Sequence, residues 1–287
     1  MKSNTGTGRS ISDDERRLLV FRAAELSARS ENSAVASSFL TSAEQRIIFE
    51  AQRAAGRSDR LFFWGGYVGA ERRKAIFLPS WLSPDGAVPQ NAFSEERERF
   101  FLRLLDEYGN GDIAEEYMCS LKLSGSGYAQ LSHRDWLGAL MALGIKRSVL
   151  GDIVTDGTDY YVFAEKSCAD YIVSQLCRAG RDAVSCTFAD LGGDFAPKRS
   201  FQELSFTVAS PRADGIIRGL CGVSREKAAQ IIAGGLAEIN YLPLSDTDRR
   251  LAAGDILSVR GYGKFIIDRA EDETKKGRIR VLARKYV

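Results

Sequence analysis

Hydrophobic residues recur at helical spacing near the start of the chain and change to strand-like runs after residue 60. The segments Ile11–Arg29 and Ser42–Ala55 place apolar residues among charged ones so that each would form one apolar helix face. Leu61–Val68 and Lys74–Leu78 are instead rich in aromatic and β-favouring residues, with a short glycine-containing stretch between them. The pattern therefore predicts two amphipathic helices followed by a β-hairpin.

A third helix and a second change of pattern follow. Ser94 is a favourable N-cap for a helix that reaches about Tyr108. Residues 111 to 189 then predict strand, helix, strand, strand, helix and strand, in the order Ile113–Leu123, Arg134–Leu143, Gly151–Thr155, Tyr160–Ala164, Ser167–Ala179 and Ala183–Phe188. This β-α-β-β-α-β order is that of ferredoxin-like and RRM-like domains, so we expect an RRM-like middle domain.

The C-terminal part of the chain predicts two short helices lying on a sheet. The first helix spans Arg212–Leu220, and Gly222 provides the break after it. Ser224 is a favourable N-cap for the second helix. Segments with strand character are Phe201–Val208, Leu236–Tyr241, Ile256–Arg260, Lys264–Asp268 and Arg278–Ala283. Two helices joined so tightly bury little surface alone and need such a sheet to pack against.

These patterns together predict an α+β protein with three domains. An N-terminal region of helices and a β-hairpin covers residues 1–108, and the RRM-like (ferredoxin-like βαββαβ) middle domain covers 109–192. Residues 190–200 contain two glycines and a proline and form a linker, and the last domain covers 203–287.

Charge is distributed unevenly along the chain. The net charge of the 287 residues is +2, but the part from Arg212 onward holds 15 Lys and Arg against 10 Asp and Glu. Residues 1–211 accordingly carry 25 basic against 28 acidic side chains. A basic surplus in one domain is typical of a surface that meets nucleic acid.

Composition argues against several classes of protein. His133 is the one histidine in the sequence, so a histidine-based zinc site or catalytic triad is not expected, and we expect no metal and no cofactor. The five cysteines are widely spaced without a C-x-x-C pair, which favours reduced, mostly buried thiols. No apolar stretch is long enough to span a bilayer, and the polar first residues lack a secretory signal, so we expect a cytoplasmic protein without membrane contact.

Candidate RNA-binding residues concentrate in the last domain. Arg212 and Arg225 lie at helix starts, where backbone N–H groups and the helix dipole already favour a phosphate and a guanidinium adds a bidentate grip. The predicted RNA-binding set is Arg212, Ser224, Arg225, Lys227, Asn240, Arg260, Lys264, Lys275, Lys276 and Arg278. A possible second contact in the middle domain comprises His133, Arg134, Lys146 and Arg147.

The order of several residues in the last domain resembles the S-four RNA-binding domain (αL-type), the module named after small-subunit ribosomal protein four. The matching positions are Arg212, Asp214, Ser224, Arg225, Ala228, Ile231, Gly234, Asn240, Gly254, Asp255, Ile256 and Val259. The chain departs from the common R-L-D start of that domain by having Ala213 in the middle. This resemblance implies an RNA-binding function for residues 203–287.

A wider resemblance extends over most of the chain. The phrases GGYVGAERRK (65–74), LSHRDWLGALMALGIKRSVLGDI (131–153), SVRGYGKF and TKKGRIRV are similar to those of the YlmH family of bacterial S-four proteins. That resemblance implies a non-enzymatic, monomeric factor of ribosome quality control. Its partners would be ribosomal RNA and tRNA, on a large ribosomal subunit that carries peptidyl-tRNA while the stalled nascent chain is tailed.

Two other hypotheses remain open on the sequence. One is an RNA-modifying enzyme of pseudouridine-synthase type that uses Asp135 or Asp152, although the phrase His133-Arg134-Asp135 lacks the leucine of that family's H-R-L-D motif. The other is a structural cell-division factor that acts through protein contacts of the middle domain.

Overall fold

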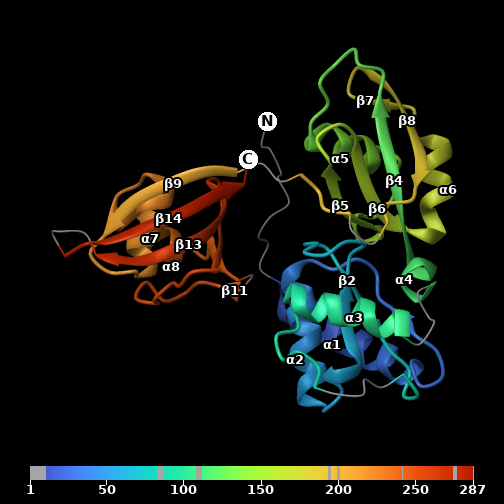
Figure 1. Cartoon of the computed structure of the whole chain (residues 1–287), viewed down its shortest axis with the longest axis horizontal. Coiled ribbons are helices and arrows are strands. Elements are labelled where there is room, and N and C mark those ends of the chain that lie inside the picture. Colours follow the sequence, from blue (N-terminus) through green and yellow to red (C-terminus); the bar gives the residue numbers. More distant parts are fainter. Residues whose placement is uncertain are drawn as a thin grey trace. The chain divides into compact units, whose positions relative to one another are not determined.

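A computed structural model describes residues 11–82, 87–107, 112–192, 195–198, 201–240, 242–273 and 277–286. Its contacts divide the chain into two compact units, one comprising residues 11–198 and the other containing the C-terminal part from residue 199. From residue 11 onward, the N-terminal region (1–108) and the middle domain (109–192) predicted from the sequence fall within the same unit. Figure 1 shows the elements of each unit.

The N-terminal part of the first unit surrounds a small antiparallel sheet with helices. The helices are α1 (Asp13–Arg29), α2 (Ser42–Ala54) and α3 (Glu95–Glu107), and a 3-10 turn η1 (Ser58–Arg60) precedes the hairpin. The strands β1 (Val35–Ala36), β2 (Leu61–Trp64) and β3 (Lys74–Phe77) are ordered β1-β3-β2. The predicted hairpin is confirmed, and every residue of β2 and β3 is buried because the sheet is covered on both faces.

The middle part of this unit is a five-stranded sheet with helices on one face. In chain order its elements are α4 (Asp112–Tyr117), β4 (Met118–Gly125), α5 (His133–Ala142), η2 (Arg147–Val149), β5 (Leu150–Thr155), β6 (Tyr160–Glu165), α6 (Lys166–Gln175), β7 (Arg178–Ala179) and β8 (Asp182–Ala189). The strands are ordered β5-β6-β4-β8-β7, and all of their pairings are antiparallel. The β-α-β-β-α-β order expected from the sequence is present from β4 to β8.

Two predicted boundaries in this part are wrong. Residues 112–117 form the short helix α4, so the strand expected from Ile113 begins only at Met118. The helix expected to reach Ala179 ends at Gln175, because Arg178 and Ala179 turn away to pair with Ala183 and Asp182. Periodicity alone does not locate such element boundaries.

One hydrophobic cluster joins the N-terminal sheet to the middle sheet. Phe62 and Ile76 from the hairpin lie in the same buried cluster as Met118 of β4 and Phe163 of β6. A separate cluster, which includes Leu121, fills the space between the middle sheet and α5 and α6. The sheet of the middle part is therefore packed on both faces along β6.

The C-terminal unit packs two short helices on one six-stranded antiparallel sheet. Its elements are β9 (Phe201–Val208), α7 (Ala213–Cys221), α8 (Arg225–Ala233), β10 (Ala237–Ile239), β11 (Leu242–Pro243), β12 (Ile256–Val259), β13 (Gly263–Glu273) and β14 (Ile279–Tyr286). The strand order is β11-β10-β12-β13-β14-β9. The helix pair and the strands predicted here are confirmed, and β9 joins this sheet beside β14.

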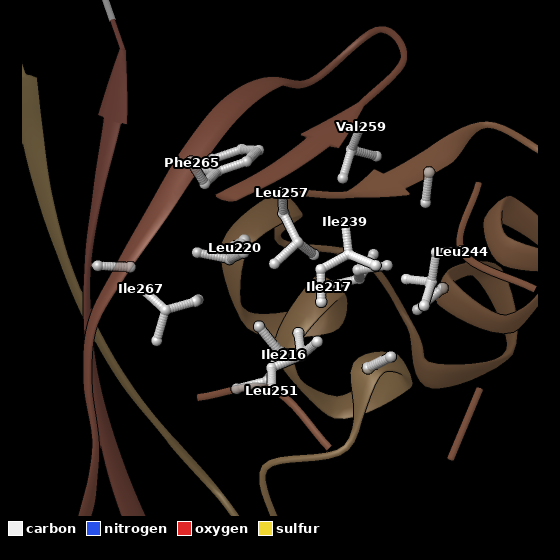
Figure 2. Packing of buried hydrophobic residues seen from close by; sticks show 14 of the residues in the cluster. Ile216, Ile217, Leu220, Ile239, Leu244, Leu251, Leu257, Val259, Phe265 and Ile267 are labelled. Carbon is white, nitrogen blue, oxygen red and sulfur yellow. The ribbon is translucent and has the colours of Figure 1, made fainter. Parts of the chain in front are cut away.

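The core of this unit lies between the helix pair and the sheet. Ile216, Ile217 and Leu220 of α7 meet Leu257, Val259, Phe265 and Ile267 from the strands (Figure 2). Gly219 permits this close packing, because a Cβ at that position would lie 2.1 Å from the ring of Phe206. The helices are thus fixed to the sheet by apolar contacts, while the side chains of Arg212 and Arg225 at their starts remain accessible.

Among the described residues, no helix combines the length and the apolar character that crossing a membrane requires.

Candidate nucleic-acid interface

Two arginines and one carboxylate meet where the two helices of the C-terminal unit begin. Arg212 is the N-cap residue of α7, Asp214 lies in the first turn of that helix, and Arg225 is the first residue of α8. The Nε of Arg225 donates to Oδ2 of Asp214 at 2.8 Å, and the Nε of Arg212 donates to Oδ1 at 3.4 Å. Both arginines predicted to hold phosphates are therefore bound to the same acidic side chain.

The shared carboxylate is buried and charged. Burial alone would raise the pKa of Asp214, but hydrogen bonds from Arg225, Arg212 and the Gly215 amide outweigh it, so the pKa is lowered. The two guanidinium groups differ in exposure, with 63% of the Arg225 side chain accessible against 34% of the Arg212 side chain. Arg225 therefore presents more of its N–H groups to a ligand.

A loop that is distant in sequence adds two more cations to this surface. The backbone oxygens of Arg249 and Thr247 accept hydrogen bonds from the amides of Ala213 and Asp214, at 2.8 and 3.2 Å. Arg250 is paired with Arg212 in an isolated antiparallel bridge. Arg249 and Arg250 are both exposed, and they are absent from the set predicted from the sequence. In the sequence, the only sign of this site is the Arg249-Arg250 doublet itself. No nearby residue in the sequence connects the doublet to the starts of α7 and α8.

We call the cations around these helix starts, Arg212, Arg225, Lys227, Arg249 and Arg250, the arginine surface. Within it, the hydroxyl of Ser224 accepts a hydrogen bond from the Lys227 amide at 3.1 Å. Ser224 is therefore the N-cap of α8 that the sequence predicted. The side chain of Lys227 is exposed in the first turn of that helix.

Asn240 has a structural role that the sequence did not predict. It has a positive φ of 48°, its Nδ2 donates to Asp255 at 2.7 Å, and its Oδ1 accepts from the Ile256 amide at 2.9 Å. These bonds fix the end of β10 against the start of β12. Contact of Asn240 with RNA stays a prediction.

The other predicted residues of this unit lie away from the helix starts. Arg260 is exposed in the turn after β12. Lys264 lies on the sheet face opposite the helices, because its neighbour Phe265 points into the core, and its Nζ is 5.2 Å from the Tyr286 ring centre. Arg278 donates to the backbone oxygen of Thr207 at 3.0 Å. Lys275 and Lys276 lie outside the described residues.

The four residues of the possible second contact, in the middle part of the first unit, have different surroundings in the structure. His133, Arg134 and Lys146 are exposed near the start of α5 and the turn after that helix. Arg147 instead donates from Nη1 to the backbone oxygens of Leu150 and Gly151, at 2.6 and 3.0 Å. Burial, together with nearby Arg72, lowers the pKa of Arg147 to about 10. The guanidinium group of Arg147 is therefore already hydrogen-bonded to the backbone of β5.

The two aspartates considered as catalytic candidates both have structural partners. Asp135 forms a capping box with Ser132 at the start of α5. Asp152 accepts hydrogen bonds from the Tyr67 hydroxyl at 2.8 Å and from the Glu71 and Arg72 amides at 2.7 and 3.1 Å. Burial raises the pKa of Asp152, and the nearby charge of Glu71 raises it further. Asp152 thus connects β5 to the loop between β2 and β3.

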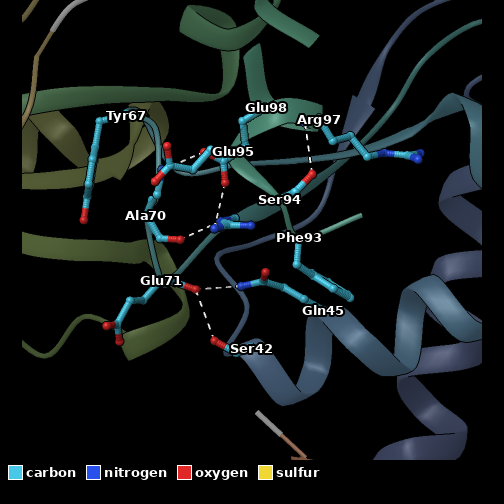
Figure 3. A network of polar contacts seen from close by, with 12 residues as sticks. Ser42, Gln45, Tyr67, Ala70, Glu71, Phe93, Ser94, Glu95, Arg97 and Glu98 are labelled. Carbon is cyan, nitrogen blue, oxygen red and sulfur yellow. Dashed lines mark hydrogen bonds and ion pairs between the residues drawn. The ribbon is translucent and has the colours of Figure 1, made fainter. Parts of the chain in front are cut away.

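Three consecutive cations at the end of that loop and the start of β3 each anchor a different part of the first unit. Arg72 donates to the backbone oxygen of Leu150, Arg73 forms an ion pair with Glu98 of α3 at 2.7 Å, and Lys74 reaches Glu165 at 2.8 Å. Figure 3 shows this loop, in which the backbone oxygen of Glu71 also accepts from Gln45. The basic phrase ERRK therefore has a structural role.

The aromatic side chains on the outer face of β6 are covered. Tyr161 and Phe163 are 8% and 2% exposed, and the ring of Phe195 lies 5.4 Å from Tyr161 and 6.4 Å from Phe163, between ring centres. Tyr67 packs against Phe163 at 5.2 Å. In RRM domains such strand aromatics stack on bases. In this conformation these rings are not accessible for stacking.

A curated relative matches nearly the whole chain. The "Ribosome-associated protein quality control protein P2" of Bacillus subtilis (strain 168) is 32% identical over 244 residues, which are 85% of this chain and 84% of that protein. The chain belongs to the YlmH family. The resemblance inferred from the phrases at 65–74 and 131–153 is thereby confirmed.

Two further comparisons concern the same family. The family model described as "Putative RNA-binding domain in YlmH" matches residues 118–191, which begin at β4 and end just after β8. The solved "Cell division protein ylmH from Streptococcus pneumoniae" has a TM-score of 0.41 and 15% identity, covering 65% of this chain and 97% of that one. In this YlmH-family chain, the residues matched by the family model include His133, Arg134 and Lys146.

Proposed function

We propose that this YlmH-family chain is a non-enzymatic protein that binds ribosomal RNA and tRNA on the large ribosomal subunit. The observation that carries the proposal is the arginine surface, where cations from three segments converge on the starts of α7 and α8. The dipole of each helix favours an anion at its start, and guanidinium groups suit phosphates. The name of the Bacillus subtilis relative supports a role in ribosome-associated quality control. That the bound subunits carry peptidyl-tRNA is part of the proposal and follows from the family resemblance.

We assign the C-terminal unit as an S-four domain and the β4–β8 region as an RRM-like domain. The first assignment is supported by the helix pair on a sheet, with the motif residues Arg212, Asp214 and Arg225 brought together. The second is supported by the element order and by two helices packed on one face of the sheet. His133, Arg134 and Lys146 would supply a second RNA contact within the region matched by the family model.

The absence of catalysis is part of the proposal. The structural partners of Asp135 and Asp152 support it, since each carboxylate already serves a helix cap or a loop contact. Within the described residues, no three His, Cys, Asp or Glu side chains are arranged to hold a metal ion. We further propose that the protein is a cytoplasmic monomer that works without a cofactor.

Sedimentation with separated ribosomal subunits tests the proposal. We expect the protein to travel with the large subunit, and the double variant Arg249→Ala/Arg250→Ala to remain mostly in the unbound fraction. The matched control is Arg22→Ala/Arg29→Ala on α1, which removes the same charge from exposed positions and should still co-sediment. A protein that fails to bind, or a C-terminal variant that binds as well as the control, would contradict the proposal.

A further inference from the structure

Asp214 places a negative charge within the otherwise positive arginine surface. A negative charge beside a phosphate-binding surface opposes binding, because it reduces the local positive potential. Yet Asp214 is only 5% exposed and lies between the two arginines at the helix starts. Its N–H partners keep it ionised, so the unfavourable charge is present at neutral pH.

We infer that Asp214 is a positioning residue, which fixes the guanidinium groups of Arg212 and Arg225 in the orientation that binds neighbouring RNA phosphates. The inference rests on the proposed function and concerns the same surface. Asp214 itself would not touch RNA, since its side chain is buried beneath the arginines that it binds.

The atoms used in these contacts support the inference. Arg225 donates to Asp214 through Nε, and the fork of a guanidinium carries four further N–H bonds on its two Nη atoms. Holding the planar group by Nε therefore fixes its direction while the Nη edge remains available at a side chain that is 63% accessible. A lysine could not reproduce this, because an ammonium has no second edge.

Arg212 is held more completely than Arg225. Its Nε and Nη2 both face Asp214, at 3.4 and 3.5 Å, and Nη2 also bonds Asp248. Arg250 stands opposite Arg212 on the adjacent segment, so its side chain is placed beside the clamped pair. The buried carboxylate thus sets the geometry, and the loop supplies additional charge.

The substitution Asp214→Asn distinguishes a positioning role of Asp214 from a purely electrostatic effect of its charge on RNA binding. It makes the protein one charge more positive, so a purely electrostatic account predicts tighter binding to purified ribosomal RNA. Positioning predicts weaker binding by about tenfold, which corresponds to one charge-assisted hydrogen bond of about 1.4 kcal/mol. The slope of log affinity against log salt should also become shallower by about 0.9 for each phosphate that the variant no longer binds.

Glu226→Gln is the matched control. Glu226 is exposed in the first turn of α8, next to Arg225 in sequence, so its replacement changes the net charge equally without releasing a buried clamp. We expect affinity that is unchanged or slightly increased. If Asp214→Asn bound RNA as tightly as Glu226→Gln, or more tightly, the inference would be overturned while the proposed function stood.

Arg225→Lys keeps the test decisive if Asp214→Asn melts at a lower temperature. This variant conserves charge at an exposed position but removes the Nε donor and the planar fork. We expect a wild-type melting temperature and about tenfold weaker RNA binding. Wild-type affinity in Arg225→Lys would count against positioning, whereas a wild-type protein that fails to bind the large subunit would refute the proposed function instead.

Discussion

The cations of the ERRK phrase and those of the arginine surface have opposite surroundings. In the first unit, the side chains of Arg73 and Lys74 are 10% and 4% accessible, and each is paired with a carboxylate. In the C-terminal unit, the side chain of Arg225 is 63% accessible although it is bonded to Asp214. Arg73 and Lys74 therefore connect segments of the fold, whereas Arg225 presents its charge to solvent.

This difference shows that a basic motif does not by itself indicate an RNA-binding surface. The phrase ERRK carries three cations against two at the start of α8, yet burial and pairing commit those three to contacts within the first unit. Burying a charge is costly unless it is paired, so these residues are matched by carboxylates or backbone oxygens. Exposure combined with convergence from several segments is the better indicator of a site for phosphates.

The largest expected effect is a division of RNA binding between the two units. We expect residues 199–287 alone to bind structured RNA with an affinity that falls steeply with salt, by roughly 0.7 to 0.9 in log–log slope per phosphate contact. The N-terminal fragment, residues 1–198, should bind more weakly, because acidic side chains outnumber basic ones in the part of the chain before Arg212. Filter binding or fluorescence anisotropy over a range of salt concentrations measures both fragments.

The opposite result would be equally informative. If residues 1–198 bound RNA as tightly as the C-terminal fragment, the exposed His133, Arg134 and Lys146 would carry a main contact. Alanine at these three positions should then abolish binding of that fragment. The contrast between the units would fail, and the region matched by the family model would take the leading role.

A smaller effect, on stability, is expected from Arg73→Met. This change removes the ion-pair partner of Glu98, a carboxylate whose side chain is only 2% accessible. Breaking such a buried pair costs about 3–5 kcal/mol in the free energy of unfolding. Urea denaturation of the fragment 1–198 measures this cost.

The control for Arg73→Met is Arg46→Met. Arg46 pairs with Glu50 one turn away, and the side chains are 31% and 46% accessible. Pairs of this kind at the surface of a helix contribute about 0.3–0.5 kcal/mol, so the change should be small. Equal destabilisation in the two variants would show that burial does not distinguish these cations.

The smallest expected effect concerns Asp135, which tests whether this carboxylate is structural or catalytic. Hydrogen bonds from the side chain and backbone of Ser132 lower the pKa of Asp135. A lowered folded-state pKa means that the carboxylate stabilises the helix above its unfolded pKa, and that this stabilisation disappears as pH falls through the folded value. Asp135→Asn should therefore cost at most about 1 kcal/mol at pH 7 and nothing at low pH.

Chemical denaturation at several pH values measures the structural part of that prediction. Mass spectrometry of ribosomal RNA and tRNA from cells carrying Asp135→Asn measures the catalytic part. We expect every nucleotide modification to persist. A modification that disappears with this change would establish the RNA-modifying alternative.

Local signals in the sequence were sufficient for most secondary structure and for the helix starts. Ser224 predicted an N-cap that the structure confirms, because capping depends on residues only a few positions apart. The hairpin and the helix pair followed from apolar periodicity in the same way. Boundaries failed at Ile113, which lies in the short helix α4, and at Ala179, which pairs with the nearby residue Asp182 instead of continuing α6.

Tertiary structure alone decided which charged residues belong together. The sequence placed Arg212 and Arg225 at helix starts, but only the fold shows that both bond Asp214 and that Arg250 stands opposite Arg212. Likewise, only the fold shows that Arg147 donates to backbone oxygens. It also shows that Asp152 accepts hydrogen bonds from the Glu71 and Arg72 amides, about 80 residues away in sequence. Propensity and periodicity report on neighbours along the chain, whereas burial, pairing and pKa depend on the side chains that folding brings into contact.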